Sequence, residues 1–140
     1  MPDLERSFKV KHNDFGKAGE VSIEVQGILK DIGFDPALIR RVSICAYESE
    51  INVVMHGGDG TVLLTIDPEI IALDVKDDGP GISDIALALR DGYSTATLEH
   101  REMGFGAGMG LSNIKNNADS LEVNSEKGMG TRLQIGFKVE

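Results

Sequence analysis

The chain has 140 residues, of which 26% are charged and 41% hydrophobic, and its formal net charge at pH 7 is −9. This length suits one domain that covers residues 1–140. No apolar run is long enough to cross a membrane, and the negative net charge disfavours direct binding of nucleic acid. The start, "MPDLERSFKV", lacks the layout of a signal peptide, and the single Cys45 cannot form an intrachain disulfide. We therefore expect a cytoplasmic protein, with Cys45 as a small core residue.

The first part of the chain predicts one strand and two helices. Residues alternate between apolar and polar over Ser7–Asn13, which is typical of a strand. Apolar residues recur at helical spacing over Asp14–Ile32. A second helix should begin at Pro36, capped by Asp35, and should run to about His56.

The second part predicts strands around a glycine-rich loop. Two β-rich runs, "TVLLTID" and "IIALDVKD", flank Pro68-Glu69 and predict a hairpin. Ser83 could cap a short helix, weak periodicity over Asp91–Gly110 indicates a loop, and a helix should begin near Met109 or Gly110. "SLEVNSE" and "TRLQIGFKV" predict a closing hairpin. This order favours an α+β fold, a two-layer sandwich whose mixed, mainly antiparallel sheet has helices on one face.

The second helix contains the first candidate site. Glu48 and Asn52 are four residues apart and therefore share a helix face, with His56 one turn further. A carboxylate and an amide in this arrangement could accept a proton and hold Mg²⁺ through oxygen. Taken alone, the pair is more often an ordinary solvated helix face.

The stretch "LDVKDDGPGIS" contains the second candidate site. Asp77 and Asp78 end a strand and are followed by Gly79-Pro80-Gly81, where bare backbone lets a ligand approach. This arrangement suits recognition of an exocyclic amine such as that of adenine, although a tight turn uses the same residue types. A calcium loop is excluded because Lys76 and Ile85 stand where oxygen ligands are needed.

The glycine-rich run "GFGAGMG" is the third candidate site, and it leads directly into a predicted helix. Its backbone N–H groups and the positive end of the helix dipole together could bind an anion, most plausibly phosphate. Neither a Walker P-loop nor the dinucleotide-binding spacing is present. The alternative is a flexible linker followed by a helix.

In chain order, E-x-x-x-N on a helix, D-x-G-x-G at a strand end, a glycine loop opening a helix and a late Gly-Thr resemble the GHKL ATPases of the Bergerat fold. The resemblance covers residues from about 35 to 139 and implies ATP and Mg²⁺ as cofactors. It implies that Glu48 is the catalytic base, Asn52 the Mg²⁺ ligand and Asp77 the adenine-reading carboxylate. Further nucleotide contacts are expected at Gly79, Gly81, Gly104, Gly106, Gly108, Met109, Gly110, Leu111 and Thr131.

The chain length narrows the resemblance within this superfamily. At 140 residues there is no room for the extra domains of histidine kinases or gyrase, so the chain most resembles the anti-sigma factor and switch-protein serine kinases. That resemblance implies a protein-serine kinase that phosphorylates a STAS-domain antagonist, sequesters a sigma factor or other regulator, and controls transcription by partner switching. Residues 91–110 would form its ATP lid, and a homodimer is compatible with the family.

One departure from the family pattern leaves a second function open. Some members carry an arginine just ahead of the last glycine pair, where this chain has Gly106 and Ala107. Arg101 and Lys115 are the nearest cations upstream and downstream, and each is more often an ordinary surface charge than a substitute for that arginine. Without a cation the transferred phosphoryl group loses charge stabilisation. The alternative is a nucleotide-gated protein-binding module without significant phosphotransfer.

Overall fold

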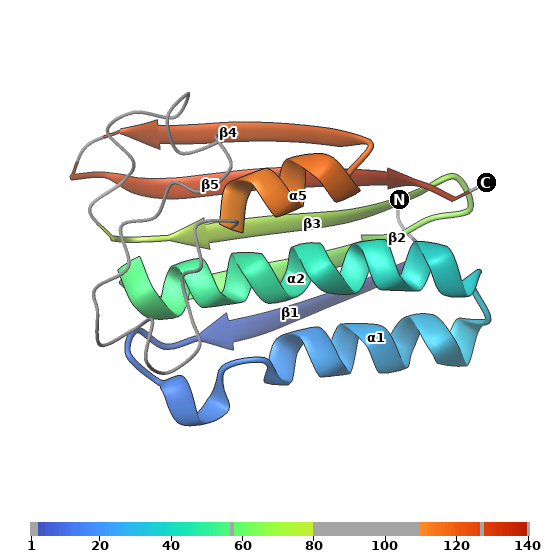
Figure 1. The fold of residues 1–140 in the computed structure, drawn as a ribbon, viewed down its shortest axis with the longest axis horizontal. Coiled ribbons are helices and arrows are strands. Elements are labelled where there is room, and N and C mark those ends of the chain that lie inside the picture. The colour runs from blue at the N-terminus through green and yellow to red at the C-terminus, as the bar shows by residue number, and fades with distance from the viewer. Residues whose placement is uncertain (1–2, 57, 80–109, 127, 140) are drawn as a thin grey trace.

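The structure is a computed structural model that describes residues 3–56, 58–79, 110–126 and 128–139 (Figure 1). Its elements in chain order are strand β1 (Leu4–Val10), the 3₁₀ turn η1 (Phe15–Lys17), helices α1 (Glu20–Ile32) and α2 (Pro36–His56), strands β2 (Gly60–Ile66) and β3 (Ile70–Asp77), helix α5 (Gly110–Asn117), and strands β4 (Ser120–Glu126) and β5 (Gly130–Lys138).

The five described strands form one sheet in the order β1-β2-β3-β5-β4, and all four pairings are antiparallel. Helices α1, α2 and α5 lie side by side over one face of this sheet (Figure 1). The α+β two-layer fold with helices on one face is therefore confirmed, while the sheet, which was expected to be mixed and mainly antiparallel, is antiparallel in all its described pairings. In the β2–β3 turn, the Asp67 carboxylate accepts hydrogen bonds from the N–H groups of Glu69 and Ile70, at 2.9 and 2.7 Å.

Helix α2 has the start and length that the sequence predicts. The Asp35 carboxylate accepts a hydrogen bond from the N–H of Ala37 at 3.0 Å, which satisfies a donor that the first helical turn would otherwise leave free. The proline at the first helical position lacks an N–H and therefore loses nothing there. Helix α5 likewise begins at Gly110, one of the two expected starts.

The start of α1 differs from the prediction. A helix was expected from Asp14, but only the short turn η1 forms there, and α1 begins at Glu20. Gly19 has φ of 99°, a left-handed conformation that a continuing helix does not allow. Strand β1 is also displaced towards the N-terminus from the expected Ser7–Asn13, and Asn13 has φ of 63°, which turns the chain.

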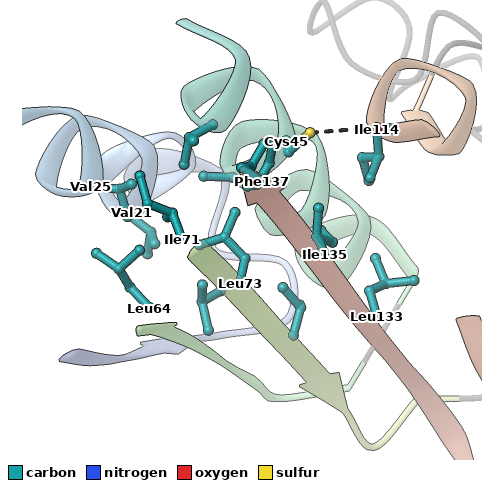
Figure 2. Close-up of a cluster of buried hydrophobic side chains, with 14 of the residues drawn as sticks. Val21, Val25, Cys45, Leu64, Ile71, Leu73, Ile114, Leu133, Ile135 and Phe137 are labelled. Carbon is teal, nitrogen blue, oxygen red and sulfur yellow. Dashed lines mark hydrogen bonds between the residues drawn. The ribbon is translucent and has the colours of Figure 1, made fainter. Parts of the chain in front are cut away.

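The core lies between α1, α2 and α5 on one side and the sheet on the other. Figure 2 shows its side chains converging from these elements, namely Val21, Val25, Cys45, Leu64, Ile71, Leu73, Ile114, Leu133, Ile135 and Phe137. Cys45 is fully buried, its thiol donates a hydrogen bond to the carbonyl of Ile114 at 3.6 Å, and burial raises its pKa to about 12. Its expected role as a core residue is confirmed. None of the described helices combines the length and apolar character needed to span a bilayer.

Candidate functional site

One end of the fold gathers the predicted site residues. The C-terminal half of α2, the end of β3, and the starts of α5 and β5 all meet at this end, on the left in Figure 1. A Cβ on Gly60 would come within 2.9 Å of Cγ1 of Val53, the residue after Asn52. Gly60 also pairs with Asp77 across β2 and β3. The helix that carries Asn52 therefore packs against β2 beside the strand that carries Asp77.

Glu48 is half-buried on α2 and faces α5. The side-chain amide of Asn113 donates a hydrogen bond to its carboxylate, with 3.4 Å between Nδ2 and Oε2. Burial raises the pKa of Glu48 above its usual value, and the hydrogen bond from Asn113 lowers it in part. A carboxylate with a raised pKa, held in one orientation by a neighbour, is suited to accept a proton near neutral pH.

Sequence reasoning did not identify Asn113. The signal was a polar residue one turn into the helix that follows the glycine loop, three positions after Gly110 and therefore on the same helix face. Helix α5 is also fixed to α2 at its C-terminal end, because Nε of Arg41 donates to the carbonyl of Asn117 at 2.8 Å. Arg41 forms a 3.0 Å ion pair with Asp119 as well. These contacts hold Asn113 opposite Glu48.

Asn52 lies against the start of α5. A Cβ built on Gly110 would be 3.3 Å from the carboxamide oxygen of Asn52, closer than most such contacts. Only a glycine leaves this space open without displacing the amide. The structure therefore brings together three predicted residues, since Glu48 is one turn before Asn52 on the same face.

Asp77 forms the second part of the site, at the end of β3. Its carboxylate accepts a hydrogen bond from the N–H of Gly79 at 2.9 Å, and it pairs with Thr131 of β5 in the sheet. Burial raises the pKa of Asp77, while backbone hydrogen bonds from Gly79 and Thr131 oppose the rise. The hydrogen bond between Asp77 and Gly79 closes a tight turn, which was the alternative interpretation of this stretch. It also holds the carboxylate in a defined orientation.

Two glycines allow the backbone around Asp77 to pack closely. Gly130 has φ of 89°, and a Cβ there would collide with the carbonyl oxygen of Asp77. A Cβ on Gly58 would collide with the carboxylate of Asp78. The Gly-Thr pair is thus held directly against the strand end, as the order of motifs indicates.

Glu50 was not singled out by the sequence and has a structural role. It is 2% exposed, and its carboxylate accepts hydrogen bonds from the N–H groups of Gly19, Val21 and Ser22, at 3.0, 3.4 and 3.3 Å. A side chain of α2 therefore caps the N-terminus of α1, whose positive dipole end favours a carboxylate.

The remaining predicted residues divide into two groups. Leu111 is 6% exposed and belongs to the hydrophobic core, so its side chain packs in the core and leaves only the backbone for a nucleotide contact. The others lie outside the described residues, together with the predicted helix after Ser83 and the loop 91–109. They are Gly81, Gly104, Gly106, Gly108 and Met109.

The residues present fit the chemistry of a nucleotide with Mg²⁺. Asn52 and Glu48 offer oxygen atoms, and Mg²⁺ is usually held by one or two protein oxygens with substrate phosphates and water completing its shell. The open space at Gly110 leaves room beside Asn52. Within the described ranges, no group of three or more His, Cys, Asp or Glu side chains could hold a metal by itself. A site of this kind therefore needs a ligand that brings its own oxygens.

The fold, the order of motifs and this site define a family. Residues 39–140 match the family described as histidine kinase-, DNA gyrase B-, and HSP90-like ATPase. The chain belongs to this family, the GHKL ATPases, over most of its length.

Within the family, the chain is similar to bacterial regulators. It is 27% identical over 113 residues to a protein named serine/threonine-protein kinase RsbT from Bacillus subtilis (strain 168), covering 78% of this chain and 79% of that protein. It is 32% identical over 108 residues to an anti-sigma F factor from Thermoanaerobacter sp. (strain X514), covering 72% of each. An anti-sigma F factor from Clostridium acetobutylicum is 30% identical over 106 residues, with 71% of each covered.

Proposed function

We propose that the chain is an ATP-dependent protein-serine kinase of the partner-switching type. It would transfer the γ-phosphoryl group of ATP to a serine of a STAS-domain antagonist and so regulate transcription. The relatives named as a serine/threonine kinase and as anti-sigma factors support this assignment, together with membership of the ATPase family.

The observation that carries the proposal is the environment of Glu48. Its carboxylate is half-buried, has a raised pKa and is held by Asn113, one helical turn from Asn52. In the proposed reaction Glu48 takes the proton of the serine hydroxyl while the serine oxygen forms a bond to the γ-phosphorus. The bond from the γ-phosphorus to the bridging oxygen breaks, and ADP leaves. The reaction thus needs only a positioned base beside a bound phosphate.

The nucleotide would occupy the space between Asn52 and Asp77. The carboxylate of Asp77 would accept a hydrogen bond from the adenine amine, with Gly79, Gly81 and Thr131 close to the base. Mg²⁺ held by Asn52 would neutralise phosphate charge, which matters because Glu48, Asp77 and Asp78 give this end of the chain a negative character. The backbone from Gly104 to Leu111 and the dipole of α5 would add positive potential, with 91–110 as the lid.

The partners follow from the same assignment. Besides the STAS-domain antagonist, the chain would bind a sigma factor or another regulator, without contacting nucleic acid itself. It would act in the cytoplasm, where transcription takes place, and could do so as a homodimer.

A specific feature of the loop supports a second candidate. The run Gly104–Gly110 contains no cation that could stabilise the transferred phosphoryl group. If the missing cation prevents transfer, the chain would be a nucleotide-gated binding module. Its bound nucleotide would then set its affinity for the partner without significant phosphotransfer.

Incubation with γ-labelled ATP, Mg²⁺ and a STAS-domain protein of the same organism distinguishes these functions. Label on a serine of the STAS protein supports the kinase. Bound nucleotide without transfer supports the binding module and contradicts the kinase. Free phosphate without a labelled protein indicates simple ATP hydrolysis, and no nucleotide binding contradicts all three.

A further inference from the structure

An open groove runs along the outer face of α2, between α1 and α5, and we call it the α2 groove. Its volume is about 820 Å³. The side chains that face it from α2 recur at helical spacing, at positions 36, 39, 40, 43, 44, 47 and 48, so they form one stripe on the helix. Those used below are Lys30, Arg40, Ile44, Tyr47, Glu48 and Asn113.

The middle of the α2 groove is apolar, and its far end carries two basic side chains beside the apolar Phe34 and Pro36. Ile44 and Tyr47 are only half-buried, so each exposes apolar surface to the groove. Lys30 and Arg40 are exposed, and neither takes part in any of the salt bridges of the described residues. Two unpaired cations beside apolar side chains are notable on a chain with a net charge of −9. This combination favours a ligand that is apolar in part and acidic at one end.

The proposed catalytic base, Glu48, lies at the near end of the α2 groove. Glu48 and its partner Asn113 both line the groove. The phosphates would bind at Asn52, one turn further along α2, and at Gly110, the first residue of α5, and neither residue lines the groove. A hydroxyl that reaches Glu48 must come from the side that the nucleotide does not occupy. The groove offers that route.

We propose that the α2 groove is the docking site for the acceptor segment of the protein substrate, a conclusion that rests on the kinase function proposed above. The acceptor serine lies at Glu48, apolar side chains contact Ile44 and Tyr47, and an acidic residue lies between Lys30 and Arg40. Glu48 and Arg40 are eight residues apart on a helix, or about 12 Å. An extended chain covers this distance in about four residues, which places the acidic residue about four positions from the serine.

The test is steady-state phosphorylation of the STAS-domain protein by Arg40→Glu. We expect about a tenfold lower kcat/KM for the protein substrate, mainly through KM, with the KM for ATP unchanged. Lys9→Glu is the matched control, because it makes the same change of charge on the exposed part of β1, and it should stay within about twofold of wild type. A second variant, Ile44→Asp, should also raise KM for the protein substrate.

Charge reversal in the substrate provides the sharpest form of the test. Changing the acidic residue about four positions from the labelled serine to lysine should weaken phosphorylation by wild type and restore it with Arg40→Glu. Equal KM values for wild type and Arg40→Glu would overturn the proposal. So would a sedimentation result in which Arg40→Glu dissociates a dimer of this chain and leaves phosphorylation intact, because a second copy would then occupy the groove.

Failure of the kinase function would be recognised separately. If wild type transfers no label, binding of the fluorescently labelled STAS protein in the presence of ADP and Mg²⁺ still tests the groove. Weaker binding to Arg40→Glu than to Lys9→Glu would retain the docking site in a binding module, and equal binding would remove it.

Discussion

Gly110, the first residue of α5, lies against the carboxamide of Asn52 on α2, where a Cβ would come within 3.3 Å of Oδ1. The end of the glycine loop and the proposed Mg²⁺ ligand are therefore close neighbours, although they are 58 positions apart in the sequence. A substitution at Gly110 should therefore alter the position of the Asn52 side chain.

Replacing Gly110 with alanine should weaken binding of ATP with Mg²⁺ by about tenfold, since the added methyl group displaces the amide oxygen of Asn52. Calorimetric titration measures the change. Gly27→Ala is the control, because nothing lies within 4 Å of a Cβ there, in the middle of α1. That change should leave nucleotide affinity unaltered and raise the free energy of unfolding by about 0.5–1 kcal/mol. Equal affinities in Gly110→Ala and wild type would show that the contact has no role in binding.

Asp77→Asn should reduce ATP affinity by about 10- to 100-fold, because the asparagine has only one acceptor oxygen, which is neutral and cannot serve both the Gly79 N–H and the adenine amine as the two carboxylate oxygens can. Asp74→Asn provides the comparison on the same strand. Its carboxylate is engaged by Arg132, at 3.0 and 2.7 Å, and the change should not affect ATP binding. Affinities measured by calorimetry that are the same for both variants would exclude the proposed position of adenine.

The rate of phosphotransfer should fall as the pH is lowered, and the fall should begin above the usual pKa of a glutamate. The reason is that burial raises the pKa of Glu48, which must be ionised to accept a proton. In Asn113→Ala the hydrogen bond that lowers this pKa is lost, so the acidic limb of the profile should move to higher pH. The rate at mildly acidic pH should drop by about three- to tenfold.

Single-turnover rates at saturating ATP, measured across pH, would reveal this shift. Asn116→Ala changes the same residue type at an exposed position of α5 and should keep the wild-type profile. A profile for Asn113→Ala that is uniformly lower but unshifted would mean that Asn113 acts on packing and not on the protonation of Glu48.

Glu50→Ala should lower the free energy of unfolding by about 2–4 kcal/mol, since it leaves the capped N–H groups of α1 without a partner. Urea unfolding measures this loss, and the exposed Glu24→Ala on α1 should change it by no more than about 0.5 kcal/mol. A similar small change for both would contradict the capping role.

The pH dependence of stability has a definite sign for Glu50. Burial raises its pKa, so the folded chain binds this proton more tightly than the unfolded chain. Proton binding by Glu50 therefore stabilises the folded chain most below the usual glutamate pKa. This contribution is lost as the pH rises through the raised pKa of the folded chain. In Glu50→Ala this part of the pH dependence should disappear.

Local sequence signals were sufficient for α2. The Asp35 cap, the first-turn proline and the helical spacing of apolar residues all act within the segment, and they predicted both its start and its end. The two β-rich runs on either side of Pro68-Glu69 likewise predicted the hairpin of β2 and β3, because the runs and the turn are close in sequence.

Contacts between distant segments could not be predicted in the same way. Glu50, 31 residues from Gly19, caps the start of α1, and the apolar spacing over Asp14–Ile32 gave no sign of this contact. The Asn113–Glu48 hydrogen bond joins residues 65 apart and depends on how α5 packs on α2. The order of motifs could place both segments at one site, but only the packing selects which side chains meet.

The central claim is that Glu48 is the base for phosphotransfer, and single-turnover transfer from γ-labelled ATP to the STAS-domain protein by Glu48→Gln tests it most directly. Calorimetry should show that this variant binds ATP with Mg²⁺ about as tightly as wild type. We predict that label appears on a serine with wild type and that its transfer falls by at least about 100-fold with Glu48→Gln. Transfer at the wild-type rate by a variant that binds ATP normally would contradict the account.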